Sequence, residues 1–375
     1  MRLNQGLNYP IGLDISDLSL KFVQLNDSRG NISIKNFGKI DLPNGLIDGG
    51  LINDEKAVLS AITELLSKNK LTGGKIEVVA PLPETKTFIK LIELEQSPNN
   101  LPDMVQAEME RHLPLSLKEL YFDWQVIKNL PDKKLILVGA APKNIVDQYI
   151  SLLKSANFFI SALEIESTAI CRGLLAAESP YYTGQHDQNY CIIDFGAKRS
   201  SLIIYSKNTI VLSVSVPISG EAITAEIAKT LEFDKAQAEK AKIICGLDKD
   251  RAKGIISDIL AKKIDELIGR IKEALGFFSE NYPDRGPINE IILCGGGAGI
   301  RKLDEIIYNA TKIKTVLGNA FTNIKHAEQQ SSMLETHSLK DKKLGDKSLI
   351  VNQDSSLTYV TAIGLALRSI FLEKK

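Results

Sequence analysis

The chain has 375 residues, more than one ordinary hydrophobic core accommodates, and its length therefore predicts two lobes. Hydrophobic residues make up 44% and charged residues 25%, which excludes a mostly disordered chain. The 46 basic residues equal the 46 acidic ones, so a strongly polyanion-binding surface over the whole molecule is excluded and no nucleic-acid partner is expected. Pro10 and Asp14 interrupt the start before an apolar run develops, which argues against a signal peptide. We expect a cytosolic protein that meets a membrane only through a partner.

A strand–turn–strand pattern occurs twice. Each copy has an apolar strand that reaches an aspartate near its end, a tight turn, and a returning strand. The copies occupy residues 11–25 and 192–205, and a third strand follows each of them at residues 31–40 and 209–217. The aspartates are Asp14 and Asp194. This repetition predicts two related lobes that face a shared cleft.

The other elements follow from hydrophobic periodicity. Helices are expected at residues 53–68, with Asn53 as the N-cap, and at 101–112, 144–156, 221–231, 235–244, within 252–280, 300–309 and 357–372. Strands are expected at residues 75–82, 87–93, 120–128, 134–140 and 289–294. The elements between about residues 85 and 161 form a compact α+β unit that interrupts the first lobe. Residues 326–348 lack periodicity and are expected to form a loop or a partly mobile insertion.

Two features suggest phosphate chemistry. Two aspartates facing each other could hold a hydrated Mg²⁺ that bridges to phosphates, and Lys21 could reach a phosphate as a point charge. The glycine turn at residues 295–299 lies between a strand and a helix, where a backbone can approach an anionic ligand. The turn comes too late in the chain for a dinucleotide-binding fingerprint, and no P-loop sequence is present. Purely structural interpretations stay open: the aspartates could be ordinary turn residues, and the glycines could form a tight turn without a ligand.

Taken together, these pieces resemble the actin-like ATPase superfamily over nearly the whole chain. Residues 14–21 are similar to its phosphate-1 loop, residues 194–196 to its phosphate-2 loop and residues 293–297 to its adenosine loop. Residues 238–242 (AEKAK) resemble the segment whose glutamate and lysine contact the nucleoside. Glu166 matches an acidic position at the start of the first connecting helix that orients water in relatives.

Within the superfamily, the chain most resembles the PilM family of type IV pilus assembly proteins, and next the FtsA family. Three segments show this resemblance: VAPLP at residues 79–83 before the inserted module, MERHLPL at 109–115 followed by Asp123, and AIGLALR at 362–368. The resemblance implies an α/β, actin-like (ribonuclease H-like) two-lobe fold with an inserted α+β subdomain in the first lobe. The implied units are residues 1–84 (first lobe core), 85–162 (inserted subdomain), 163–180 (connecting helix), 181–220 (second lobe core), 221–285 (helical subdomain), 286–356 (second lobe core) and 357–375 (closing helix).

The resemblance also implies a site for ATP and Mg²⁺. Its expected members are Glu166 as the catalytic residue, Asp14 and Asp194 as metal ligands, and, for the nucleotide, these two aspartates with Ser16, Lys21, Gly196, Lys198, Ser200, Gly220, Glu239, Lys242, Gly295, Gly296 and Gly297. The implied role is an ATP-binding platform of the pilus inner-membrane assembly complex, cytoplasmic and peripheral to the inner membrane. It would bind the cytoplasmic tail of a PilN-like membrane protein, and the pilus motor ATPases are further candidate partners.

Two turns depart from the superfamily pattern. Ser16 and Asp17 replace glycine-rich character in the first turn, and Asp17 adds a like charge near phosphates. In the second, Lys198 and Arg199 stand where active relatives often have acidic and glycine residues. The cations favour phosphate binding, but a water-positioning acid is missing, so binding is expected rather than brisk turnover. A membrane-associated filament ATPase and a small-molecule kinase of the same fold stay open as alternatives. Taken alone, Glu239 and Lys242 are also an ordinary surface ion pair.

Overall fold

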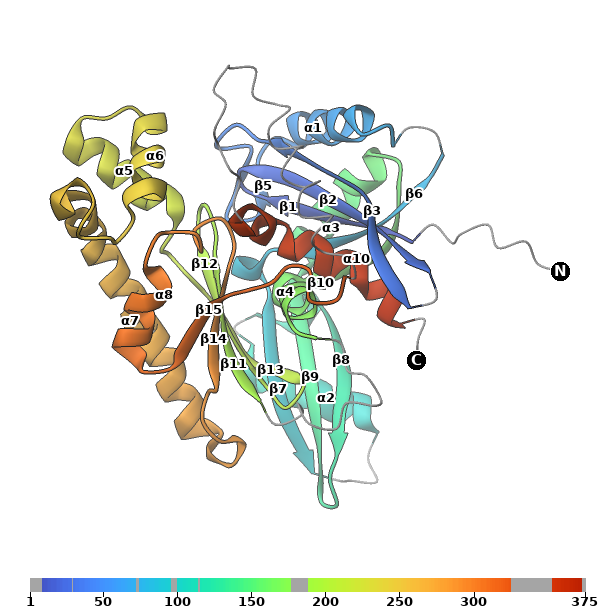
Figure 1. Ribbon diagram of the computed structural model, residues 1–375. Helices are drawn as coiled ribbons and strands as arrows, with labels where there is room; N and C mark the ends of the chain where they lie inside the picture. The colour runs from blue at the N-terminus through green and yellow to red at the C-terminus, as the bar shows by residue number, and fades with distance from the viewer. Residues whose placement is uncertain are drawn as a thin grey trace.

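The first lobe is built on a mixed five-stranded sheet. The computed structural model describes residues 9–28, 30–71, 74–95, 100–113, 115–176, 188–324 and 353–372. The sheet has the order β10-β6-β1-β2-β3 (Figure 1), with bounds β1 Ile11–Ser16, β2 Ser19–Ser28, β3 Asn31–Asp41, β6 Ile76–Leu82 and β10 Phe158–Ile165. β1 pairs antiparallel with β2 and parallel with β6, so the end of β1 lies centrally in the sheet.

The second lobe repeats this arrangement. Its sheet has the order β13-β12-β11-β14-β15, with bounds β11 Asn189–Phe195, β12 Ser200–Ser206, β13 Thr209–Val216, β14 Glu290–Cys294 and β15 Lys314–Leu317. β11 pairs antiparallel with β12 and parallel with β14, as β1 does with β2 and β6. The two hairpins are therefore equivalent in sheet context as well as in sequence, which agrees with two related lobes.

A small α+β unit stands below the first lobe. Its sheet has the order β7-β9-β8, with bounds β7 Phe88–Glu95, β8 Leu120–Asn129 and β9 Lys133–Pro142, and it carries α2 Leu101–His112. Helix α2 occupies the predicted residues, and Val105 and Met109 on it are buried against the sheet. The apolar face of α2 is thus part of the core of this unit.

The expected range 85–162 for this unit also contains elements that pack elsewhere. Helix α3 (Lys143–Ser155) has five buried side chains, and Tyr149 and Leu152 among them lie in the first-lobe core. β10 pairs parallel with β6 along its whole length. The inserted unit is therefore the segment from β7 to β9, and α3 returns the chain to the first lobe.

Two helices cross between the lobes (Figure 1): α4 (Glu166–Leu174) and α10 (Val360–Leu372), which follows η5 (Gln353–Tyr359). They approach each other closely, because a Cβ on Gly364 would lie 1.8 Å from the carbonyl oxygen of Ala169. The expected insertion at residues 326–348 lies outside the described residues.

The remaining elements are α1 Glu55–Lys68, α5 Gly220–Leu231, α6 Lys235–Cys245, α7 Ile255–Asn281 and α8 Leu303–Thr311, the short pair β4 Ile47–Asp48 and β5 Leu51–Ile52, and the 3₁₀ turns η1 Glu84–Lys86, η2 Leu117–Glu119, η3 Ala252–Gly254 and η4 Pro283–Arg285. The N-cap of α1 was predicted wrongly. Asp54, not Asn53, accepts the N–H of Ala57 at 3.0 Å, and the Asn53 amide donates instead to the carbonyl of Gly45. In the described ranges, no helix combines the length and apolar character needed to cross a bilayer.

Candidate functional site

The first hairpin presents a buried ion pair. Asp14 and Lys21 face each other across β1 and β2, and the Lys21 ammonium lies 2.8 Å from Asp14 Oδ2. Ser16 Oγ donates to the other carboxylate oxygen at 2.7 Å. Both groups of the pair are buried, so neither charge is left uncompensated away from water. The structure thus joins three of the predicted residues in one contact.

The second hairpin brings Asp194 toward this pair. Burial, and after it the negative charge of Asp14, raises the pKa of Asp194 to about 6, while Lys21 acts against the rise. The influence of Asp14 on Asp194 indicates that the ends of the two hairpins lie near each other. Cys294 Sγ lies 3.7 Å from Asp194 Oδ1 and closes one side of the carboxylate.

The two carboxylates suit a magnesium ion that keeps most of its waters. A divalent cation would oppose the effects of burial and of the Asp14 charge, which together raise the pKa of Asp194. Within the described residues, no three His, Cys, Asp or Glu side chains converge as a metal cage. Both oxygens of Asp14 already accept hydrogen bonds, from Ser16 and Lys21. Waters and phosphate oxygens would therefore have to complete the coordination shell.

Glu166 belongs to the same cluster. It is the first residue of α4 and keeps partial access to solvent. Burial, followed by the charges of Asp194, Asp14 and Glu84, raises its pKa well above the ordinary value. A carboxyl group whose pKa is raised holds its proton more readily than an exposed glutamate, which is a property of general acids and bases.

The turn after Asp194 is braced against the start of α5. A Cβ on Gly196 would lie 2.4 Å from the carbonyl oxygen of Arg199, so the turn is too tight for a side chain there. The N–H of Gly220 donates to the Gly196 carbonyl at 3.1 Å. Ser200 Oγ donates to the Ile218 carbonyl at 2.6 Å, so its hydroxyl holds the loop in place. Lys198 is partly exposed and Arg199 is exposed on this turn, so both cations are accessible to a ligand.

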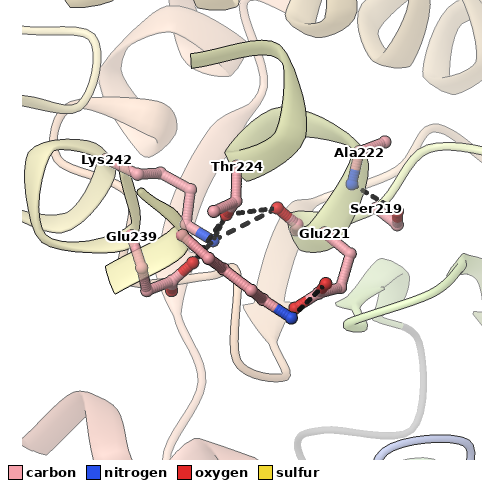
Figure 2. Close-up of polar contacts among 8 residues, drawn as sticks. Ser219, Glu221, Ala222, Thr224, Glu239 and Lys242 are labelled. Atoms are coloured by element: carbon pink, nitrogen blue, oxygen red, sulfur yellow. Dashed lines mark hydrogen bonds and ion pairs between the residues drawn. The ribbon is translucent and has the colours of Figure 1, made fainter. Parts of the chain in front are cut away.

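Figure 2 shows how α5 and α6 are joined behind this turn. The buried Lys242 ammonium donates to the Gly220 carbonyl at 3.2 Å, to Thr224 Oγ1 at 2.9 Å and to Glu239 Oε2 at 2.7 Å. These contacts use all three donors of the ammonium. Lys242 is therefore a cross-link between the two helices, neither an ordinary surface ion pair nor free to bind a ligand. The Glu239 side chain is 42% exposed, so it is the member of the pair that can reach a nucleoside.

The glycine turn after β14 packs against the end of β11. Gly295 has a φ of +80°, and a Cβ there would lie 2.3 Å from Asp194 Oδ1. The N–H of Gly297 donates to the Phe195 carbonyl at 2.8 Å, and a Cβ on Gly297 would lie 1.9 Å from the Phe195 ring. A Cβ on Gly296 would meet only Thr358, at 3.8 Å. Two glycines are thus required by packing, and the backbone at Gly296 has room for a ligand.

Helix α8 begins at Leu303, three residues later than predicted, because Lys302 has a left-handed φ of +61°.

Sequence reasoning did not anticipate the contacts of Asp17 and missed Glu84. The carboxylate of Asp17 accepts the N–H groups of Gly49 and Gly50 at 3.2 and 3.0 Å, so it holds the turn between β4 and β5. Glu84 is buried beside the first turn of α4 and accepts the N–H of Ser167 at 3.2 Å. No local pattern signals either contact, because the partners are more than 30 residues away in the chain.

Two lobes on equivalent hairpins, joined by α4 and α10, define an actin-like fold. The fold is shared by a solved structure of the PilM–PilN type IV pilus biogenesis complex, with a TM-score of 0.77, 22% identity and coverage of 96% of this chain and 98% of that one. It is also shared by the ethanolamine utilization protein EutJ from Carboxydothermus hydrogenoformans, with a TM-score of 0.55, 14% identity and coverage of 96% and 90%.

Comparison of the sequence with known families identifies the family of this chain. Residues 12–370 match the family described as type IV pilus assembly protein PilM, and the chain belongs to this family. The cell division protein FtsA of Buchnera aphidicola subsp. Baizongia pistaciae (strain Bp) is 23% identical over 158 residues. That match covers 36% of this chain and 38% of the relative, so this chain spans well under half of that protein.

Proposed function

We propose that this protein binds ATP with Mg²⁺ between its lobes and, in that form, serves as a platform of the type IV pilus assembly complex at the inner membrane. The observation that carries the proposal is the cluster of Asp14, Lys21 and Asp194 at the ends of two equivalent hairpins. Paired carboxylates and a buried lysine at facing turns suit a triphosphate with its magnesium ion.

Each part of the cleft has a role in this proposal. Mg²⁺, when bound, would neutralise phosphate charge and bridge to the two aspartates through its waters. Lys21 and Lys198 would attract phosphate oxygens from opposite lobes, and the exposed Glu239 would face the ribose. The open backbone at Gly296 would lie against the adenosine.

Binding fits the cleft better than fast hydrolysis. Glu166 has the raised pKa expected of an acid or base, but it shares the cluster with two further carboxylates. The second turn offers Lys198 and Arg199 and no acidic residue that would position a water. We therefore propose that ATP acts as a structural ligand that is hydrolysed slowly or not at all.

The partner in this proposal is the cytoplasmic tail of a PilN-like inner-membrane protein. Support comes from the family match and from the fold shared with a protein solved in a PilM–PilN complex. The protein would stay in the cytoplasm and reach the membrane through this partner. A small-molecule kinase is less well supported, because among the described residues the second-lobe aspartate in the cluster, Asp194, is the one that we assign to the metal.

Isothermal titration calorimetry with ATP and Mg²⁺ tests the nucleotide part. Asp194→Ala should weaken binding at least about tenfold, because a carboxylate that helps to hold the metal is lost. Asp265→Ala, on the exposed face of α7, is the matched control and should bind as the unaltered protein does. With excess EDTA the difference between Asp194→Ala and the unaltered protein should disappear. Equal affinity of the two proteins with Mg²⁺ present would remove Asp194 from the site.

A further inference from the structure

Glu84 joins three parts of the molecule at one point. It lies in η1, in the short link between β6 of the first lobe and β7 of the inserted unit. One carboxylate oxygen accepts a hydrogen bond from Ser213 Oγ on β13 of the second lobe. The other accepts the N–H of Ser167 at 3.2 Å, in the first turn of α4. The side chain is only 9% exposed.

The link that carries Glu84 is attached firmly to the first lobe. Thr85 Oγ1 donates to the Gly49 carbonyl at 2.6 Å, and a Cβ on Gly50 would lie 2.1 Å from Pro83 Cβ. Asp17, which follows the first hairpin strand, holds this Gly49–Gly50 turn through two N–H groups. The Glu84 carboxylate therefore moves with the phosphate-facing turn of the first lobe, whereas Ser213 moves with the second lobe.

The surroundings of Glu84 also connect it to the cleft and to the inserted unit. Burial raises the pKa of Glu84, and the hydrogen bonds from Ser213 and Ser167 lower it, so these donors stabilise the charged form. The charge of Glu84 in turn contributes to the raised pKa values of Glu166 and Asp194. β13 lies beside β7 (Figure 1), so the contact with Ser213 stands where the second lobe meets the inserted unit.

We propose that the Glu84–Ser213 hydrogen bond is a latch that couples closure of the two lobes around ATP to the position of the inserted unit. Glu84 is a positioning residue in this scheme and touches no ligand. A ligand that favours the closed arrangement strengthens the latch, and by reciprocity loss of the latch weakens that ligand. The inference rests on the proposed binding of ATP and adds its regulation through one identified contact.

The test is a matched pair of serine substitutions on β13. Ser213→Ala removes the latch. Ser215→Ala removes a hydroxyl from the same face of the same strand, and among the described residues the buried Ser215 Oγ has no hydrogen-bond partner. ATP–Mg²⁺ affinity is measured by calorimetry, and hydrogen exchange of the β7 amides is measured with and without ATP–Mg²⁺.

Ser213→Ala should bind ATP–Mg²⁺ about tenfold more weakly, the range expected for a hydrogen bond to a charged group. Ser215→Ala should bind as the unaltered protein does. ATP should slow exchange in β7 of the unaltered protein and of Ser215→Ala, but much less in Ser213→Ala. Ser213→Thr, which keeps the hydroxyl, should restore both readouts, and Glu84→Gln, which keeps the size but not the charge, should lose part of each.

The outcomes separate this inference from the proposed function. If the unaltered protein does not bind ATP, the proposed function fails and the latch fails with it. If it binds ATP and Ser213→Ala matches it in affinity and in β7 protection, only the latch is overturned. Equal weakening by Ser213→Ala and Ser215→Ala would also overturn the latch, because it would show a general role of β13 packing.

Discussion

Asp194→Asn should stabilise the ligand-free protein at neutral pH, although it removes a group that we assign to magnesium. The pKa of Asp194 is raised from its ordinary value of 3.8 to about 6 by burial and by Asp14. Because each unit of pKa corresponds to about 1.36 kcal/mol, ionised Asp194 costs the folded protein about 3 kcal/mol at pH 7.5. Asparagine has nearly the same shape and carries no charge, so this cost disappears.

The stabilisation by Asp194→Asn should depend on pH, because it removes a charge that forms only as Asp194 loses its proton. The folded state holds the Asp194 proton more tightly than the unfolded state, so the penalty is absent below about pH 4, grows through pH 6 and is complete above it. The stabilisation by Asp194→Asn should therefore fall to about half at pH 5 and vanish near pH 3.5. Urea unfolding at pH 5.0 and 7.5 measures it, with Asp265→Asn on exposed α7 as the control. Equal or lower stability of Asp194→Asn at pH 7.5 would refute the reasoning.

Two further predictions concern the glycine turn and the membrane. Gly297→Ala should weaken ATP–Mg²⁺ binding at least about tenfold in calorimetry, because the added methyl group would overlap the Phe195 ring and displace the turn. Gly269→Ala, at an open position on α7, is the control and should leave the affinity unchanged. A Gly297→Ala protein with full affinity would contradict the assignment of the turn. The protein should sediment with membranes only when the PilN-like partner is co-expressed, and binding of purified protein to bare liposomes would count against partner-dependent attachment.

Repeated local patterns made much of the fold predictable. The strand, aspartate and turn pattern around Asp14 and Asp194 requires no knowledge of distant contacts, and the two hairpins occupy equivalent places in their sheets. The apolar stripe of α2 likewise predicted its bounds. Asp14, Lys21 and Asp194 belong to these hairpins, so the sequence pattern also predicted that they form one cluster.

Contacts between distant segments were not predictable in this way. The apolar stripe of α3 shows that one face is buried, but not that it packs on the first-lobe sheet instead of the inserted unit. The carboxylate of Asp17 holds a turn more than 30 residues on, and nothing in the sequence around Asp17 indicates that contact. Lys242 looked like a ligand or a surface residue, and its burial depends on how α6 packs against α5. Each outcome is set by tertiary packing that leaves no mark on the neighbouring sequence.

A crystal structure with a non-hydrolysable ATP analogue and Mg²⁺ tests the central claim most directly. The account predicts a triphosphate between the turn after Asp14 and the turn after Asp194, a magnesium ion near both carboxylates, and a nucleoside between Gly296 and Glu239. A nucleotide bound elsewhere, or a cleft that stays empty at saturating analogue, would contradict it.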